Sequence, residues 1–267
     1  MKKITFLTIF VFVFAIIGFA EKTLEPTSAK AQYDLAEEYF SNCTPKKEYK
    51  ENCEQAVYWY QQSSAQGNLN ALSSLAYMYS NGLGVKKSKK KSFNINLSAA
   101  ESGNASAQHN LAIAFSEGEG VKKNTKTAIY WYEEAIKNGS SRAFNNLASK
   151  YEHGQGVEKD YEKALKLYQQ SASKGDCCGQ HSLSTRYFEG KITEQSDAKG
   201  LYWLEKASDS EELECADAYY DLGMLYYEGN KVEENLEKAI YLFEKAEHQD
   251  YKPAIKKLKE IEMSKNK

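Results

Sequence analysis

A spacing of 36 residues recurs along the chain and constrains its fold more than any other feature of the sequence. Four glycines keep this spacing: Gly67, Gly103, Gly139 and Gly175. A turn of the form Gly-x-Gly-Val recurs with the same period at 82–85, 118–121 and 154–157. Self-similarity at a period of 20–50 residues is typical of chains built from stacked supersecondary units. The sequence therefore predicts a repeat protein in place of ordinary globular domains.

Residues 104–139 show what repeats. The first half of this unit places apolar residues on one helical face: Ala107, Leu111, Ala112 and Phe115. The second half does the same with Ala128, Trp131, Tyr132 and Ala135. Gly118 and Gly120 lie between the halves, where a tight turn needs positive φ, and Gly139 lies where a glycine ends the second helix. The unit is a helix, a turn and a second helix.

The combined pattern resembles a known repeat family. It reads A-x-x-x-L-[GA]-x-x-[YF]-x-x-G-x-G-V and then K-A-x-x-[WL]-Y-x-x-A-x-x-x-G, and it fits best at 107–139 and 143–175. This pattern is similar to the Sel1-like repeat, a relative of the tetratricopeptide repeat, over nearly all of the chain after the first 30 residues. The resemblance implies an all-α solenoid, a right-handed superhelix of about six helix-turn-helix repeats, and adaptor or host-interaction roles.

The period divides the chain into segments. We expect a flexible lead at 21–29, repeats over 30–248, and a capping helix with a tail at 249–267. The expected repeats span 30–67, 68–103, 104–139, 140–175, 176–210 and 211–248. The second helix of the second repeat fits the pattern least well, because Ile95 and Asn96 stand where other repeats carry aromatic residues.

Residues 1–20 have the pattern of a secretory signal peptide. Lys2 and Lys3 precede an apolar run over 4–19, and small residues precede the expected cleavage after Ala20. The alternative is an uncleaved anchor, although the run is shorter than the roughly 20 residues of a transmembrane helix. We expect an exported bacterial protein, periplasmic or secreted, with no membrane span after cleavage.

The charge argues against some partners. Cleavage after Ala20 leaves 33 basic against 37 acidic residues, a net charge of −4. Such a balance disfavours general binding to nucleic acid or to anionic membranes. We expect a monomer that binds another protein or a peptide.

Five cysteines in an exported chain predict disulfides. Cys43 and Cys53 flank one lengthened loop, and their pairing is the first expectation. Cys215 opens the sixth repeat and can pair with Cys177 or Cys178, which open the fifth. Histidines at ligand spacing are lacking near these cysteines, so we expect no metal site.

The first helices of a solenoid usually line its concave face. Positions beside the buried leucine of each first helix are polar and form columns, which predict a groove for a peptide backbone or a carboxylate. The expected groove residues are Tyr77, His109, Asn110, Asn145, Asn146, Lys150, His181 and Arg186. The alternative is that these side chains are merely solvated.

We expect no catalytic residues and no cofactor. One alternative is β-lactam binding or hydrolysis, since Ser171 and Lys174 fit the S-x-x-K pattern of serine acylases, although K-T-G is missing. A further alternative is a cell-wall-associated regulator. Neither is favoured over a non-enzymatic scaffold.

Overall fold

The computed structural model describes residues 26–43, 50–209 and 215–265. The predicted signal peptide at 1–20 and most of the predicted lead lie outside the described residues. The chain divides into two compact units, and the boundary lies between Lys87 and Ser88. All regular structure in the described residues is helical, as the sequence predicts.

The first unit contains α2 (Ala29–Ser41), α3 (Lys50–Ala65) and α4 (Leu69–Asn81). The second unit contains the remaining helices. These are α5 (Lys89–Glu101), α6 (Ala105–Glu117), α7 (Thr125–Lys137), α8 (Ser141–His153), α9 (Tyr161–Ser173), α10 (Cys177–Glu189), α11 (Asp197–Ser208), α12 (Ala216–Glu228), α13 (Leu236–Glu247) and α14 (Lys252–Lys265).

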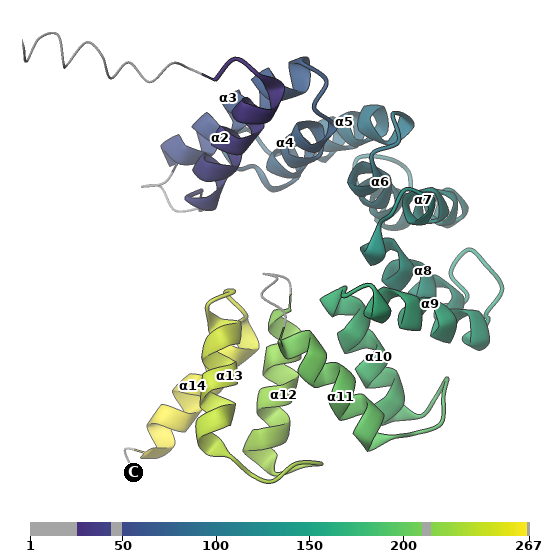
Figure 1. The fold of residues 1–267 in the computed structure, drawn as a ribbon, viewed down its shortest axis with the longest axis vertical. Coiled ribbons are helices and arrows are strands. Elements are labelled where there is room, and N and C mark those ends of the chain that lie inside the picture. Colours follow the sequence, from purple (N-terminus) through teal and green to yellow (C-terminus); the bar gives the residue numbers. More distant parts are fainter. Residues whose placement is uncertain (1–25, 44–49, 210–214, 266–267) are drawn as a thin grey trace, which may run out of the picture. The chain divides into compact units, whose positions relative to one another are not determined.

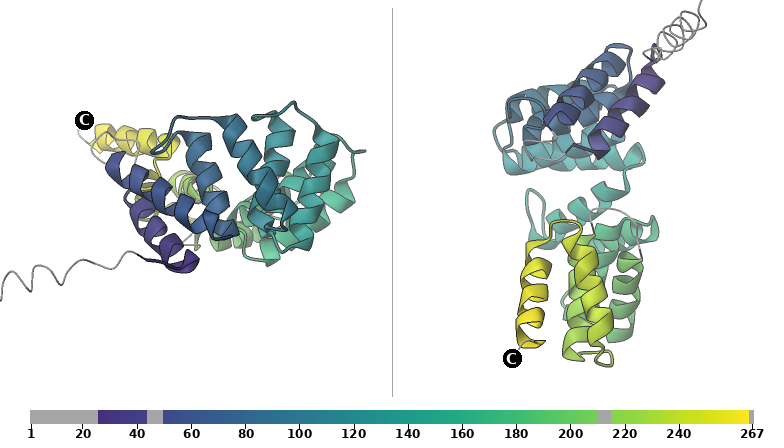
Figure 2. Two further views of the ribbon diagram at one scale, coloured as in Figure 1. Left: turned by 90° about the horizontal axis from the view of Figure 1, so that it is seen from above. Right: turned by 90° about the vertical axis from the view of Figure 1, so that its left-hand side faces the viewer.

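Within each unit, helices that follow one another in the chain pack together. In the second unit α6 packs on α7, α8 on α9, α10 on α11 and α12 on α13, and each pair also contacts the next. Figure 1 shows this succession of helix pairs, and Figure 2 shows α14 lying beside α13 at the end of the chain. The chain therefore has the tandem helix-pair architecture of an α-solenoid.

Polar side chains cap the start of most helices, and glycines end α4, α6, α8, α10 and α12. The Asn104 side chain accepts a hydrogen bond of 2.8 Å from the Ala107 amide, which satisfies a free donor of the first turn of α6. Gly118 then ends α6 in the left-handed conformation, with φ of 79°. Gly154 ends α8 in the same way. The 36-residue spacing of glycines thus sets where α4, α6 and α8 end.

Small residues let the paired helices approach closely. Ala107 and Ala112 on α6 and Ala128 and Ala135 on α7 have no exposed surface, and Tyr132 fills the space between the two helices. The equivalent positions of α8 and α9 carry Ala143, Ala148, Ala164 and Tyr168 in the core, whereas Ser171 replaces the alanine found at 135. The alternation of alanine with a large ring therefore explains why the two helical faces of the repeat fit together.

Two features depart from the pattern. Asn96 on α5 is buried at a position where other repeats place Tyr132 or Tyr168, and its Oδ1 has no hydrogen-bond partner in the described residues. At the start of α12 the N-cap residue is Cys215, which makes no side-chain capping bond. The first departure falls in the second helix of the second repeat, which fits the sequence pattern least well.

Candidate functional site

Four consecutive first helices of the second unit, α6, α8, α10 and α12, carry most of the predicted groove residues. We call their shared polar surface the first-helix face; it is made by His109, Asn110, Asn145, Asn146, Lys150, Glu152, His181, Arg186, Asp217 and Asp221. Its helices lie side by side, since α8 contacts α10 and α10 contacts α12. Tyr77 lies on α4 in the first unit, where its ring packs edge-on against Phe40 at 5.9 Å between centroids.

The first link between helices joins α8 to α6. Asn146 Nδ2 donates a hydrogen bond of 2.7 Å to His109 Nε2. Burial and, secondarily, the positive charge of Arg142 lower the pKa of His109 to about 4, against a weaker opposing hydrogen bond with Asn110. His109 is therefore neutral at physiological pH, which its role as hydrogen-bond acceptor requires.

A second link ties α10 to α8 and to α9. Arg186 Nε donates to Glu152 Oε2 at 2.9 Å, and the Tyr168 hydroxyl donates to the same oxygen at 2.8 Å. The guanidinium carbon of Arg186 lies 5.3 Å from the centre of the Tyr168 ring. Burial and the hydrogen bond to Glu152 raise the pKa of Tyr168 to about 12. Arg186 thus already has an anionic partner within the chain.

A third link joins α10 to α12. His181 Nε2 donates to Asp221 Oδ2 at 2.7 Å, and His181 Nδ1 lies 3.3 Å from Asp217 Oδ2. Burial alone would lower the pKa of His181, but hydrogen bonds to Asp217 and Asp221 and their negative charges outweigh it and raise that pKa to about 9. His181 is therefore a cation, in contrast to the neutral His109 on α6.

Lys150 turns away from open solvent. Its Nζ donates to Gln155 Oε1 at 3.0 Å and lies 3.9 Å from Glu117 Oε1, and only 9% of the residue is exposed. Burial lowers the pKa of Lys150. This lysine holds the loop after α8, so its contribution to a surface for partners is small.

The asparagines of the face differ in their hydrogen bonding. Asn145 is half-buried, and its Oδ1 is shielded from solvent with no hydrogen-bond partner in the described residues. Asn110 is also half-buried, on α6. A buried carbonyl oxygen without a donor costs roughly 1–3 kcal/mol.

Ser171, the serine of the S-x-x-K pattern, is fully buried. Its Oγ lies 2.8 Å from Asp176 Oδ2 and 3.1 Å from the Ser141 carbonyl oxygen, so its one proton has an acceptor at the start of α10 and another at the start of α8. A serine in this position supports packing between repeats and is closed to a bulky acylating substrate.

Two disulfides stabilise the chain. Cys43 pairs with Cys53 across the lengthened loop, with Cα atoms 4.8 Å apart, and Cys177 pairs with Cys215, with Cα atoms 6.0 Å apart. The second bridge joins the starts of α10 and α12 and leaves Cys178 outside both pairs. Disulfides of this kind are typical of oxidising compartments.

Metal-binding clusters and membrane-spanning helices are two features that the described part of the chain lacks. No three metal-ligating side chains gather there in a way that could hold an ion. No helix among residues 26–43, 50–209 and 215–265 is long and apolar enough to cross a bilayer.

The fold and the face together define an α-helical repeat protein of stacked helix pairs. A scan against protein-family profiles identifies the repeat: the Sel1 repeat matches at 29–68, 69–104, 105–140, 141–176, 179–211 and 216–251. The chain therefore belongs to the Sel1 repeat family, as the sequence pattern predicts. Sel1 repeats generally mediate interactions between proteins.

Solved structures show the same fold. A Sel1 repeat protein from Oxalobacter formigenes is 28% identical, with a TM-score of 0.67 over 82% of this chain and 85% of its own. A protective antigen of uropathogenic Escherichia coli with the Sel1-like repeat fold is 26% identical, with a TM-score of 0.54 over 87% of this chain and 56% of its own.

An immunity protein from Pseudomonas aeruginosa has a TM-score of 0.59 over 88% of this chain and 86% of its own. At 16% identity this likeness concerns the fold alone. A comparison with curated protein sequences finds no match.

Proposed function

We propose that the protein is an exported, non-enzymatic scaffold whose first-helix face binds a peptide segment of another protein. The observation that carries this proposal is the row of polar side chains along α6, α8, α10 and α12. Contacts between the helices hold these side chains in place, as at His109 with Asn146 and at Arg186 with Glu152. A face fixed in advance loses little side-chain entropy when a partner binds.

The polar groups suit a peptide backbone better than a strongly charged ligand. The main cations of the face, Arg186 and His181, already contact Glu152 and the two aspartates of α12. The half-buried amide side chains of Asn110 and Asn145 are uncharged, and uncharged amides suit the N–H and C=O groups of a peptide backbone. We therefore favour hydrogen bonding of an extended segment at the asparagines over recognition of a free carboxylate by Arg186.

The test is chemical crosslinking and purification of the protein from its own cell envelope. The variant Asn110→Ala/Asn145→Ala alters the proposed face, and Asn145 makes no hydrogen bond within the described residues, so little stability is lost. The matched control, Gln169→Ala/Gln170→Ala, alters exposed positions on the second helix α9. We expect one partner that the wild type and the control retain and the first variant loses. Retention by the first variant would contradict the proposal.

Export has a separate test. If residues 1–20 are removed, intact-mass spectrometry of the envelope protein gives a chain that begins at Glu21. Alkylation before reduction then leaves four of the five cysteines unmodified, because the two disulfides protect them. A chain that retains Met1–Ala20, or five alkylated cysteines, would contradict export into an oxidising compartment.

A further inference from the structure

A pocket of about 380 Å³ lies between the last turn of α11 and the helices α12 and α13. Its floor includes Tyr219 and Leu222 of α12. Tyr219 lies on the side of α12 opposite Asp217 and Asp221, because residues two positions apart in a helix point about 200° apart. The pocket is therefore separate from the first-helix face. We call it the α11–α13 pocket.

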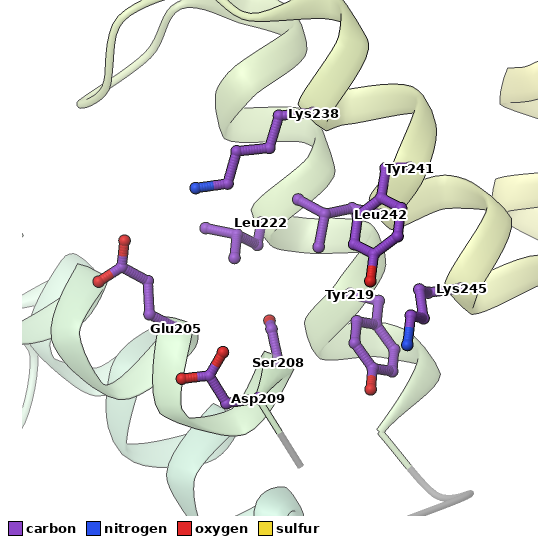
Figure 3. A pocket seen from close by; sticks show the side chains of 9 residues that line it. All are labelled: Glu205, Ser208, Asp209, Tyr219, Leu222, Lys238, Tyr241, Leu242 and Lys245. Carbon is purple, nitrogen blue, oxygen red and sulfur yellow. The ribbon is translucent and has the colours of Figure 1, made fainter. Parts of the chain in front are cut away.

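Charges of opposite sign line the two walls of this pocket. Glu205 and Asp209 come from the end of α11, and Lys238 and Lys245 come from α13 (Figure 3). The two lysines are seven positions apart, so they share one face of α13 with a separation of about 10 Å along the helix. No ion pair within the described residues joins these acids to these lysines.

The floor between the charged walls is apolar. Leu222 and Leu242 are buried and lie between the lysines and the acids in Figure 3. The Tyr241 ring stands at the rim and is 55% exposed. A ligand that fits must therefore carry a cationic group, an apolar body and an anionic group in that order.

The volume limits the size of such a ligand. Small-molecule sites usually span about 300–1,000 Å³, so this pocket is at the small end of the range. A dipeptide with apolar side chains and free ends has the required order of charges and a suitable size.

We propose that the α11–α13 pocket binds a zwitterionic apolar dipeptide. Its α-ammonium group lies at Glu205 and Asp209, and its carboxylate lies at Lys238 and Lys245. This site is independent of the proposed first-helix face, and either can fail without the other.

Part of the lysine wall also has a structural role, which supplies a control. Lys238 Nζ donates to the Tyr226 hydroxyl at 2.7 Å and lies 4.2 Å from the centre of that ring. Lys163, at the equivalent place on α9, makes the same contacts with Tyr151, at 2.6 Å and 4.0 Å. The substitution Lys163→Gln therefore removes the structural contact alone, whereas Lys238→Gln removes it together with the charge of the pocket.

The test is isothermal titration of the purified full-length mature chain with leucyl-leucine. We expect saturable binding that weakens about tenfold or more when the amino end is acetylated and when the carboxyl end is amidated, because each change removes one charge-assisted contact. These comparisons use the wild type and so do not depend on how any variant folds. Absence of saturable binding at millimolar dipeptide, or equal binding of the doubly blocked dipeptide, would overturn the proposal.

Substitutions of the charged pocket residues then test whether the dipeptide binds in the α11–α13 pocket. Lys238→Gln, Lys245→Gln and Glu205→Gln/Asp209→Asn are each expected to weaken binding about tenfold. Lys163→Gln is expected to bind as the wild type does. Circular dichroism of each variant confirms that the helices are intact. Binding that survives all three pocket changes in folded protein would place the dipeptide elsewhere and overturn the assignment.

Discussion

The imidazole of His181 on α10 lies between two carboxylates of α12, with its Nε2 2.7 Å from Asp221 Oδ2. The other ring nitrogen lies 3.3 Å from Asp217 Oδ2. The Cys177–Cys215 disulfide joins the same two helices one turn earlier along α10. The sixth repeat is thus attached to the fifth by a covalent bond and by a charged histidine.

The His181 contact predicts a loss of stability in alkali. The pKa of His181 is about 9 in the folded chain and 6.5 in the unfolded chain, so the charged contact stabilises the fold fully below pH 6.5. Its contribution, roughly 1–2 kcal/mol after allowance for the part-exposed aspartates, is lost as the pH rises through 9. Urea unfolding of the wild type and of His181→Gln should therefore differ at pH 6 and converge near pH 10. If the two proteins differed in free energy of unfolding by the same amount at pH 6 and pH 10, the charged His181 contact would not be the source of the difference.

His109 predicts the opposite behaviour in acid. Its pKa is about 4 when folded and 6.5 when unfolded, so the unfolded chain takes up a proton first as the pH falls. Stability on the order of 2 kcal/mol is lost between pH 6.5 and pH 4. His109→Gln removes the titrating group and should abolish this part of the acid sensitivity in urea unfolding. His181→Gln is the control and should leave it unchanged.

Arg186 predicts a strong coupling with Glu152. Arg186→Ala leaves the buried Glu152 carboxylate without its cation, which typically costs about 3–5 kcal/mol. Arg186→Ala/Glu152→Gln removes the uncompensated charge and should recover much of that loss. Free energies of unfolding in a double-mutant cycle measure the coupling. Additive effects of the two substitutions would show that the pair is unimportant for stability.

Two glycines with positive φ predict unequal costs of substitution. Gly120 has φ of 73°, and a Cβ there would lie 2.3 Å from the Lys89 carbonyl oxygen. Gly139 has φ of 98°, and no atom lies within 4 Å of a Cβ built there. Gly139→Ala should cost only the left-handed penalty of about 1–2 kcal/mol. Gly120→Ala adds a clash with backbone and should cost at least about 3 kcal/mol. If Gly120→Ala and Gly139→Ala lowered the urea midpoint equally, the close contact between Gly120 and the Lys89 backbone would be contradicted.

The repeat period made most of the fold predictable. Alanine, leucine and glycine recur at fixed places because each helix pair must pack on the same kind of neighbour, so positions such as Gly118 and Ala128 follow from their equivalents. The same argument predicted the positions beside each buried leucine, including His109 and Asn146. The hydrogen bond between His109 and Asn146 could not be predicted in this way, because the spacing of repeats carries no information about side-chain geometry between them.

The partners of the face were missed for a related reason. Glu152 lies five residues after Leu147, outside the columns that the sequence singled out. The available signal was its charge, since the equivalent positions carry Ser80, Ser116, Phe188 and Tyr227. Asp221 lies directly before Leu222 and so occupies one of the positions beside a buried leucine, whereas Asp217 lies five residues before Leu222, outside those columns.

Position-specific photo-crosslinking in living cells tests the central claim, binding through the first-helix face, most directly. A photoreactive residue replaces Asn110 on α6 in one strain and Gln169 on α9 in another, and both chains are purified after irradiation. The account predicts a discrete crosslinked protein from position 110 and none from position 169. Crosslinking from position 169 alone would place the binding surface on the second helices and contradict it.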